Sequence, residues 1–488
     1  MSASVSESPL EVPVATPTEP GRRPRSGPRP RPGLALAVIA GCNAMIQLDD
    51  PIMNIALPGI RADLGLSALV SSWVIGAYLL SFGGLLLLGG RAGDILGRRR
   101  MFVAGVGLFT AAAAARAGVT GGEMLIAVRV VEGAGAAFAA ANGFVLMLAT
   151  FPEGPARKRA IALCTAVGAS STAGGLLLAG ALGSVGSWRW LVLLNVPVGL
   201  AIVLLAPRVI AETERVRGRF DLRGTLLSAA GLGAVVYGLS QAGEHPWSSA
   251  RVAGPLLAGL ALLSLFIGSQ RRTDQPIVRL ALFKDRNRAL AFGSMLVLPG
   301  ALIGAYFFLS QFFQQHHGWS ALTAAFALLP VPLAMAATAA SAPRIERALG
   351  PKPMMAIGAT ALAVENLWLA QLRYEDPYLT GVLPSLVLLG AGMTFCVVPA
   401  TVLATSGLRP QELGSAGSVL NALQAIGGSL CIALLVTASA GYADFADTMS
   451  AGFTTGAGFA ATGLLIALAL RPGPTKPSGR SRASRVSR

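Results

Sequence analysis

Apolar stretches long enough to cross a lipid bilayer fill this chain from Leu34 to Leu470. Crossing the hydrocarbon core takes about 20 apolar residues in a helix. We count fourteen such stretches, which leaves little length for a soluble domain. With 53% hydrophobic and 13% charged residues, the chain is far more apolar than globular proteins are. The sequence therefore predicts an all-α integral membrane protein whose chemistry depends on the few polar groups between its helices.

The predicted spans follow one another with short connections, as in a bundle of antiparallel neighbours. They cover residues 34–57, 69–89, 101–119, 124–150, 160–183, 189–207, 221–242, 251–270, 289–312, 321–342, 353–372, 380–405, 414–438 and 451–470. Residues 1–33 are rich in proline, arginine and serine and are predicted to be a disordered tail. This tail is too long and proline-rich for a cleaved signal peptide, so we expect the first span to be retained as an anchor.

Two longer linkers, 208–220 and 271–288, interrupt the regular spacing and enclose a pair of spans. The chain thus divides into a six-helix bundle at 34–207, a linker with two inserted helices at 208–288, and a second six-helix bundle at 289–470. A weak internal similarity supports this division, because GRAGDILGRRR at 90–100 and APRIERALGPKP at 342–353 occupy equivalent places in the two bundles. Repeated halves around a central cavity are common in secondary transporters. No phosphate-binding loop is present, so we expect an ion gradient rather than ATP as the energy source, and no enzymatic activity.

The net charge of +16 could suggest a nucleic-acid partner, but its placement argues against one. Most of the 39 basic residues lie in the two tails, including the basic tail at 471–488, and in the loops on the same side as the tails. This bias predicts cytoplasmic termini and a plasma-membrane location. No arginine-rich stretch alternates with stacking aromatics, so no nucleic acid is expected. The four cysteines and three histidines show no ligand spacing, and no metal or other cofactor is expected. Abundant arginine, alanine and glycine suggest a bacterial source.

Charged residues within the predicted spans are the sharpest functional signal, because each is costly in a bilayer unless paired or hydrated. Asp49 and Asp50 lie towards the end of the first span, and Glu365 lies midway along the eleventh. Arg129 and Glu132 are three apart on the fourth span, so they can pair on one helical face. A carboxylate balanced between burial and a nearby arginine can load and release a proton. Asp49, Arg129, Glu132 and Glu365 are therefore the candidates for proton coupling; the alternative for each is a structural role.

Other polar and small residues on the spans allow two interpretations each. Tyr78, Gln311, Gln314, Asn421 and Gln424 could line a cavity or only join helices by hydrogen bonds. Small residues recur four apart on the fifth span, at Ser171, Gly175, Ala179 and Gly183. A face of small residues allows neighbouring backbones to approach closely. It serves either static packing or the sliding of two helices during alternating access.

These motifs resemble those of the major facilitator superfamily, and more narrowly those of the fourteen-span drug:proton antiporters. The resemblance covers all spans and excludes only the tails. The loop at 90–100 resembles the family's gating motif, which carries over to these residues: Gly90, Arg91, Asp94, Gly97, Arg98 and Arg99. LDDPIMNIALP at 48–58 resembles the first-span signature, with Pro51 in place of threonine. RVVEGAGAA at 129–137 resembles the fourth-span motif, in which the arginine is implicated in proton transfer, and Glu132 replaces the usual glutamine.

The fifth span departs from the antiporter motif of that family. Its glycine–proline pair falls at Gly175–Leu176, so the proline is missing, and the following glycine pair is Ala179–Gly180. SWRWLVLLNVPVG at 187–199 and FDLRG at 220–224 also resemble the fourteen-span group. The departure weakens the case for antiport but not for the fold.

The resemblance implies proton-coupled efflux of amphiphilic small molecules, such as drugs or antibiotics, by alternating access. Its expected partners are the substrate, protons and the lipid bilayer, and we expect a monomer. One alternative is a selective exporter of a single natural product made by the host. The other is a membrane sensor or scaffold that transports nothing, which the altered fifth-span motif favours.

Overall fold

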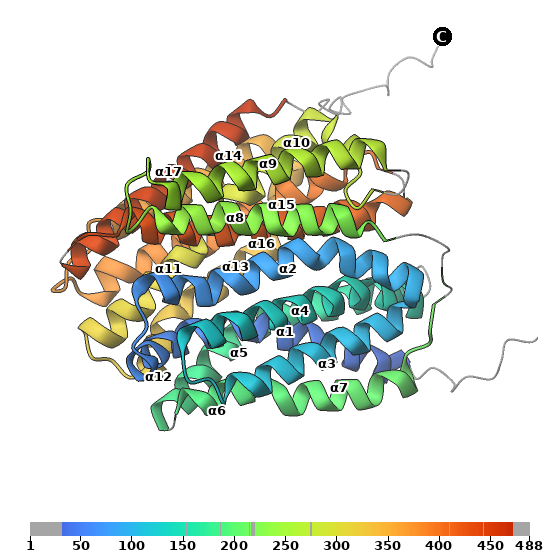
Figure 1. The fold of residues 1–488 in the computed structure, drawn as a ribbon, viewed down its shortest axis with the longest axis horizontal. Helices are drawn as coiled ribbons and strands as arrows, with labels where there is room; N and C mark the ends of the chain where they lie inside the picture. Colours follow the sequence, from blue (N-terminus) through green and yellow to red (C-terminus); the bar gives the residue numbers. More distant parts are fainter. Residues whose placement is uncertain are drawn as a thin grey trace, which may run out of the picture.

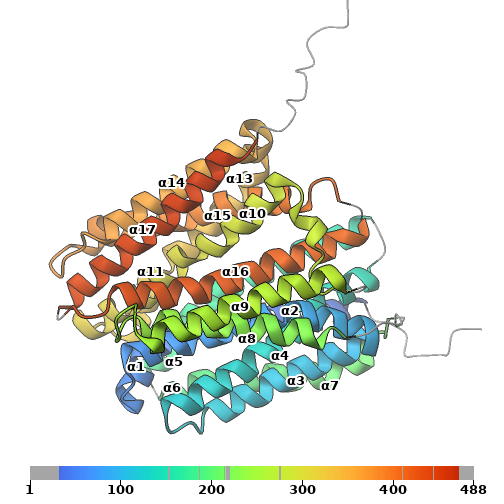
Figure 2. The ribbon, with the colours of Figure 1, turned by 45° about the horizontal axis from the view of Figure 1, so that its top comes forward.

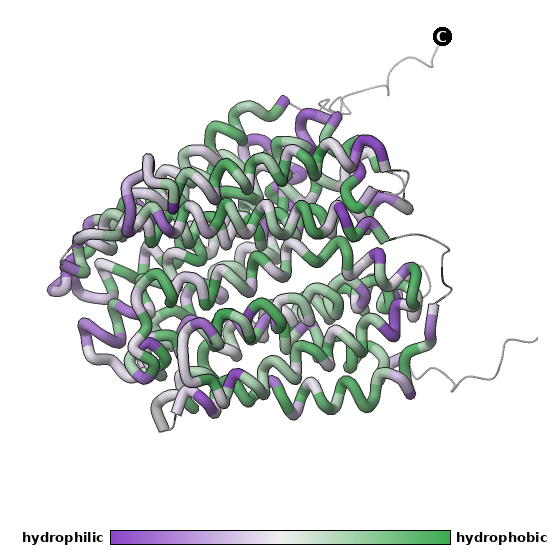
Figure 3. Tube along the Cα trace, viewed as in Figure 1, coloured by the Kyte–Doolittle hydropathy of each residue, from purple (hydrophilic) through white to green (hydrophobic). Residues whose placement is uncertain are grey.

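The computed structural model describes residues 32–471, apart from 152–153, 186, 214, 216–219, 274–275, 409 and 443. In this part of the chain the secondary structure is entirely helical, and most helices run side by side along one direction (Figure 1). Twelve helices among the described residues are long and apolar enough to cross a membrane. Apolar residues follow the middle of the helices and polar residues gather at their two ends (Figure 3). The prediction of an all-α membrane fold is confirmed.

The first seven helices form what we call the N-terminal bundle. They are α1 (Pro32–Leu64), α2 (Ala68–Leu96), α3 (Arg98–Arg116), α4 (Gly122–Thr150), α5 (Pro155–Val185), α6 (Trp188–Leu193) and α7 (Asn195–Val209). The most extensive packing inside this bundle joins α2 to α4, α3 to α4 and α1 to α5. These contacts bring α1, α3, α4 and α7 around one buried centre.

The helices from residue 280 onward form what we call the C-terminal bundle. They are η1 (Leu280–Phe283), α10 (Arg286–Val297), α11 (Pro299–Gln311), η2 (Phe312–His316), α12 (Ala321–Leu328), α13 (Pro330–Leu349), α14 (Pro351–Leu369), η3 (Tyr378–Val382), α15 (Leu383–Thr405), α16 (Pro410–Ala438) and α17 (Phe445–Ala469). Here α14 packs against α15 and α17, and α13 packs against α15.

The two remaining helices, α8 (Leu222–Gln241) and α9 (Ala250–Arg272), lie side by side across the boundary between the bundles (Figures 1 and 2). α8 packs against α2 of one bundle and α16 of the other. Thr437 Oγ1 donates to the carbonyl of Leu239 (2.8 Å), and the rings of Trp73 and Tyr237 lie 6.4 Å apart. The outer face of α9 is apolar and exposed, as expected for contact with lipid.

Proline divides three of the predicted spans into two helices. Pro197, Pro299 and Pro330 lie just after the breaks between α6 and α7, α10 and α11, and α12 and α13. Proline has no backbone N–H, so the carbonyl four residues earlier loses its helical donor. The predicted spans 189–207, 289–312 and 321–342 each contain such a break, and each remains one candidate membrane span: Trp188–Val209, Arg286–His316 and Ala321–Leu349.

Both segments that the sequence predicted as loops, at 90–100 and 342–353, are mostly helical, which corrects that prediction. α2 continues to Leu96 and α3 begins at Arg98, so the turn between them is Gly97 alone. Gly350 makes the equivalent turn between α13 and α14. Their φ angles are 109° and 85°, a region that favours glycine because it has no Cβ. The segments around both glycines have the charged composition typical of loops, but their residues continue the helices.

The bundle has two ends, which we name from the chain. The tail side holds the beginning of α1 and the end of α17, and the far side lies opposite (Figure 1). Several helix pairs join the two bundles: α2 packs against α16, α5 against α12 and α13, and α1 against α11 and α12. These pairs decide which end of the interior is closed.

Candidate functional site

Four charged side chains meet in the middle of the N-terminal bundle, and we call them the charge cluster. They are Asp49 of α1, Arg116 of α3, and Arg129 and Glu132 of α4. Each of the four is fully buried, at 0% exposure. Burying charges is costly unless they are paired and hydrogen-bonded. The geometry of the cluster satisfies most of that requirement.

Asp49 is the centre of the cluster. Its Oδ1 accepts hydrogen bonds from Arg116 Nη2 (2.9 Å) and from Asn195 Nδ2 (3.1 Å). Its Oδ2 accepts from Arg129 Nη1. Two cations and an amide therefore surround one carboxylate, and each comes from a different helix. This arrangement stabilises the ionised form of Asp49.

Glu132 lies on the other side of the two arginines. Its Oε2 accepts from Arg116 Nη1 and from Arg129 Nη1, both at 2.9 Å. Its Oε1 is buried and has no hydrogen-bond partner among the described residues. The predicted pairing of Arg129 and Glu132 on one face of the fourth span is confirmed. One oxygen of Glu132 is left available to a proton.

Arg129 is also held by groups outside the cluster. Its Nε donates to the carbonyl of Val74 on α2 (2.9 Å), and its guanidinium carbon lies 4.2 Å from the centre of the Tyr78 ring. Asp50 Oδ1 lies 3.7 Å from Arg129 Nη2, and the side chain of Asp50 is 44% exposed. Asp50 therefore connects the buried cluster to a more open environment. Counting Asp50, three carboxylates face two guanidinium groups.

Glycine on α4 explains how three helices approach closely enough to form the cluster. A Cβ at Gly133 would lie 2.5 Å from the carbonyl oxygen of Tyr78 on α2, and a Cβ at Gly135 would lie 2.5 Å from the backbone nitrogen of Phe109 on α3. Real Cβ atoms do not come so close to backbone atoms, so larger residues would push α2 and α3 away. The glycines therefore bring α2 and α3 within reach of Arg129 and Glu132.

The structure brings together three of the four predicted proton-coupling residues and separates the fourth. Glu365 lies on α14 in the C-terminal bundle, fully buried. Its Oε2 accepts from Asn366 Nδ2 (2.6 Å), its Oε1 has no hydrogen-bond partner, and none of the described ion pairs includes it. Glu365 thus has no arginine of the kind that surrounds Asp49.

Sequence reasoning missed Arg116 and Asn195. Arg116 lies inside the predicted span 101–119, so the signal of an intramembrane charge was present. Asn195 begins α7, at the break before Pro197, and the break places its side chain beside Asp49. Nothing local in the sequence marks Asn195 as a partner of a residue 146 positions earlier.

The residues of the predicted gating motif lie around the Gly97 turn on the tail side. Asp94 and Arg98 form an ion pair (2.5 Å) across the turn. The backbone N–H of Arg99 donates to Glu212 Oε1 (2.9 Å), and its guanidinium donates to the carbonyl of Ile210 (3.1 Å). The motif is therefore joined to the segment after α7 through Glu212, which carried no signal in the sequence.

The earlier glycines of that motif pack against α4. A Cβ at Gly93 would overlap Asn142, whose Nδ2 donates to the carbonyl of Gly89 (2.9 Å). Gly90 is less crowded, with Ala141 at 3.9 Å from such a Cβ. Arg91 also makes a contact within the described structure. The tail-side half of α2 is thus held close to α4.

The two glycines of the fifth-span motif face different helices. A Cβ at Gly175 would lie 3.0 Å from Leu48 Cδ2 on α1. A Cβ at Gly180 would lie 2.7 Å from Leu322 Cα and 2.9 Å from the carbonyl oxygen of Ala321, both on α12. Gly180 therefore allows the two bundles to touch on the far side.

Further contacts close the far side between the bundles. Arg61 Nη1 donates to Gln311 Oε1 (2.9 Å), and Ser310 Oγ donates to the carbonyl of Asn54 (2.7 Å). Towards the tail side, a Cβ at Gly414 or Gly417 on α16 would meet no atom within 4 Å, so this part of α16 is not tightly packed at these two positions. The interior is thus closed on the far side.

A cavity of about 250 Å³ lies in the tail-side half of the interior. Helices α1, α3, α4 and α5 line it, and Asn421 reaches it from α16 of the other bundle. Asn43, Cys42 and Phe102 contribute polar and apolar surface. Asn421 thus lines a cavity, as one of its two predicted roles required.

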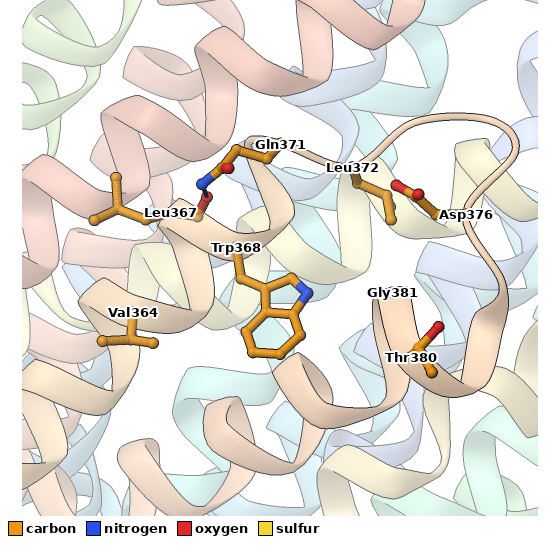
Figure 4. A pocket seen from close by; sticks show the side chains of 8 residues that line it. All are labelled: Val364, Leu367, Trp368, Gln371, Leu372, Asp376, Thr380 and Gly381. Carbon is orange, nitrogen blue, oxygen red and sulfur yellow. Dashed lines mark hydrogen bonds between the residues drawn. The ribbon is translucent and has the colours of Figure 1, made fainter.

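A larger cavity of about 560 Å³ lies elsewhere, at the far-side end of α14. The indole of Trp368 lies in its middle, facing the turn around Thr380, and Asp376 lies on the connecting loop (Figure 4). Its lining includes none of the charge cluster. Size alone therefore does not identify the functional site in this fold.

Comparison with known proteins agrees with this architecture. Residues 39–432 match the family model described as Major Facilitator Superfamily. The chain is 36% identical to the puromycin resistance protein pur8 of Streptomyces alboniger, over 85% of this chain and 83% of that protein. It is 35% identical to the cephamycin export protein CmcT of Amycolatopsis lactamdurans, over 82% of this chain and 84% of that protein. Among solved structures, the xylose transporter XylE from E. coli matches with a TM-score of 0.61 at 13% identity, covering 92% of this chain and 99% of the other, which shows a shared fold.

Proposed function

Because this chain belongs to the major facilitator superfamily, we propose that it exports amphiphilic small molecules and drives export with protons. Two similar proteins are named for puromycin resistance and cephamycin export, which supports drug or antibiotic export. Each of those two names refers to one antibiotic or one antibiotic class. A selective exporter of one natural product is therefore the second candidate. A sensor or scaffold without transport is the third.

The charge cluster is the observation that carries the proposal of proton coupling. Three carboxylates, those of Asp49, Asp50 and Glu132, share two guanidinium groups. The four buried side chains balance two negative against two positive charges, and the partly exposed Asp50 adds one negative charge beside Arg129. Uptake of one proton by one of these carboxylates would remove that excess charge. Asp49 contacts both arginines and Asn195, so it is the least suitable of the three to hold that proton.

We place the exchangeable proton on Glu132 or Asp50. Glu132 has a free buried oxygen, and Asp50 has the exposure needed for exchange with water. A substrate that changes the separation of α1 and α4 would alter the contacts of both carboxylates with Arg129. Proton release and substrate movement would then be coupled through that arginine.

The closed far side and the cavity in the tail-side half support alternating access. The cavity of about 250 Å³ reaches α16 of the second bundle through Asn421, so it lies on a path between the bundles. We propose that the tail side is cytoplasmic, as the basic residues indicate, and that substrate enters there. Export then requires the contacts of Gly180 and Arg61 with the C-terminal bundle to open.

We further propose fourteen spans, arranged as two six-helix bundles with α8 and α9 inserted between them. α3 and α14 are 19 residues each, which corresponds to about 28 Å of helix. That length nearly crosses a hydrocarbon core of about 30 Å. Both helices pack along neighbours of membrane-spanning length. The charged residues of α3 and α14 lower the mean hydropathy of these two helices, but both helices still lie within the bundle.

The test is gradient-driven uptake of ethidium and puromycin into inside-out membrane vesicles. We expect uptake by the wild-type protein when an imposed proton gradient is acid inside, because protons then leave as substrate enters. Asp50→Asn combined with Glu132→Gln should remove the dependence on the gradient, because we place the exchangeable proton on one of these two carboxylates. Asp63→Asn is the matched control, since Asp63 also lies on α1 but contacts Trp188 and Arg189 outside the cluster. Gradient-driven uptake that survives in the double variant would refute the coupling proposal.

The alternatives give different results in the same assay. Uptake of one of several chemically distinct compounds, with the others excluded, would favour the selective exporter. A sensor or scaffold would move neither compound under any gradient while a partner protein copurified with it.

A further inference from the structure

A separate cavity of about 410 Å³ lies on the far side, where both bundles meet the inserted helices. Arg61 and Ser67 line it from the N-terminal bundle. Glu244 lines it from the turn that follows α8, and Phe308 and Gln311 line it from α11. It shares no residue with the charge cluster or with the tail-side cavity. Its volume is within the range of small-molecule sites.

The cavity has two charged side chains of opposite sign, and they are the only charged residues in its described lining. Arg61 uses Nη1 to bind Gln311 Oε1 (2.9 Å) and Nε to bind the carbonyl of Leu66 (3.2 Å). No carboxylate among the described residues lies within ion-pair distance of Arg61. The side chain of Glu244 is exposed, and none of the ion pairs among the described residues includes it. The positive and negative charges are both available to a ligand.

The remaining lining contains both apolar and polar side chains. Phe307 and Phe308 of α11 are buried, with 3% and 2% of their surfaces exposed. Ser67, Thr437 and Thr448 also line the cavity, and their hydroxyl groups make hydrogen bonds within the protein. A ligand of matching chemistry has an apolar body and two opposite charges.

We propose that this cavity binds a zwitterionic amphiphile of amino-acid type. Its carboxylate binds the Arg61 guanidinium, which can form two parallel hydrogen bonds with such a group. Its ammonium group faces Glu244, and its aromatic or aliphatic body packs against Phe308. The shared Arg61–Gln311 contact places this ligand beside the junction that closes the far side.

The position of the site implies an effect on transport, and this step rests on the proposed export function. The walls come from both bundles, so separating α1 from α11 would divide the site. A ligand that needs both walls binds the closed far side better than the open one and shifts the population towards it. Occupation from outside the cell therefore inhibits export.

The test uses purified full-length protein in lipid nanodiscs and three matched probes. These are 2-naphthylalanine, its N-acetyl derivative without the positive charge, and its methyl ester without the negative charge. We expect the zwitterion to bind at least tenfold more tightly than either derivative, measured by titration calorimetry. Arg61→Met should remove the advantage over the ester, and Glu244→Gln should remove the advantage over the N-acetyl form.

Two further variants control for folding and for general charge effects. Arg61→Lys keeps the positive charge and should keep most of the preference for the zwitterion. Arg251→Met removes a cation next to His245, outside the cavity, and should leave all three affinities unchanged. Equal affinity of the wild type for the three probes, or unchanged preference in Arg61→Met, would overturn the proposal. The binding assay uses no gradient, so its outcome is independent of whether the protein exports ethidium.

Discussion

Replacing Arg116 by methionine is the most direct test of the charge cluster. Arg116 bonds Asp49 and Glu132, each at 2.9 Å, and all three side chains are fully buried. Methionine has a similar length but no charge, so the change removes one of two cations that face three carboxylates. The packing of α3 is otherwise largely preserved.

The expected loss of stability follows from these distances. At an effective dielectric constant of 20, each contact at 2.9 Å corresponds to about 6 kcal/mol of attraction. The desolvation that Arg116 no longer undergoes offsets much of this. Removing one partner of a buried pair costs about 3–5 kcal/mol net, because the other charge stays buried without compensation. We expect a loss of this size in the free energy of unfolding.

A double-mutant cycle separates this effect from a simple loss of packing. Glu132→Gln removes one negative charge while keeping an oxygen that can accept hydrogen bonds. In the double variant we expect at least ~1.5 kcal/mol less destabilisation than the sum of the single variants, because the excess charge is relieved. The measurement is denaturant-induced unfolding in mixed micelles, followed by tryptophan fluorescence, with Arg251→Met as a control expected within about 0.5 kcal/mol of wild type. A loss below ~1 kcal/mol for Arg116→Met, or strict additivity, would contradict the geometry described above.

Three further predictions concern other parts of the bundle. Gly180→Leu should hold the far side open, because a larger side chain would push α5 away from α12. In a Ser310→Cys background, an external maleimide should then label the Cys thiol faster. Gly174→Leu is the control and should leave the labelling rate unchanged, because a Cβ there meets no atom within 4 Å. Glu212→Gln weakens the acceptor for Arg99 and should speed tryptic cleavage of the 208–220 linker, and unchanged cleavage would count against a joining role. Glu365→Gln should change the free energy of unfolding by less than ~1 kcal/mol and leave ethidium export intact, because no arginine among the described residues pairs with Glu365; loss of gradient-driven export would instead make it a coupling residue.

The candidate site was only partly visible before the fold was known. Asp49, Arg129 and Glu132 stood out because a charge inside an apolar stretch is rare and costly. Arg116 carried the same signal but lies near the end of its predicted span, where a charge also occurs at a membrane surface. Asn195 carried no such signal, since asparagine is common at helix starts and turns.

The turn motif shows a different limit of sequence reasoning. Its charged residues predicted a loop at 90–100, but all of them continue α2 or α3 on either side of the Gly97 turn. Charged residues are compatible with helices that extend beyond the bilayer, so composition did not separate loop from helix. The positive φ of Gly97 identifies the one true turn in this segment.

The local properties of the chain were enough to predict the membrane, the helices and most of their order, because hydropathy over about 20 residues decides whether a segment enters lipid. The pairing of helices is a property of distant segments, so only the tertiary structure could join Asp49 to Arg116 and Asn195, or place Arg61 beside Gln311. Lipid tails are as apolar as the surfaces of the helices, so the hydrophobic effect does not select which helices pair. Close packing and a few polar contacts decide which helices become neighbours.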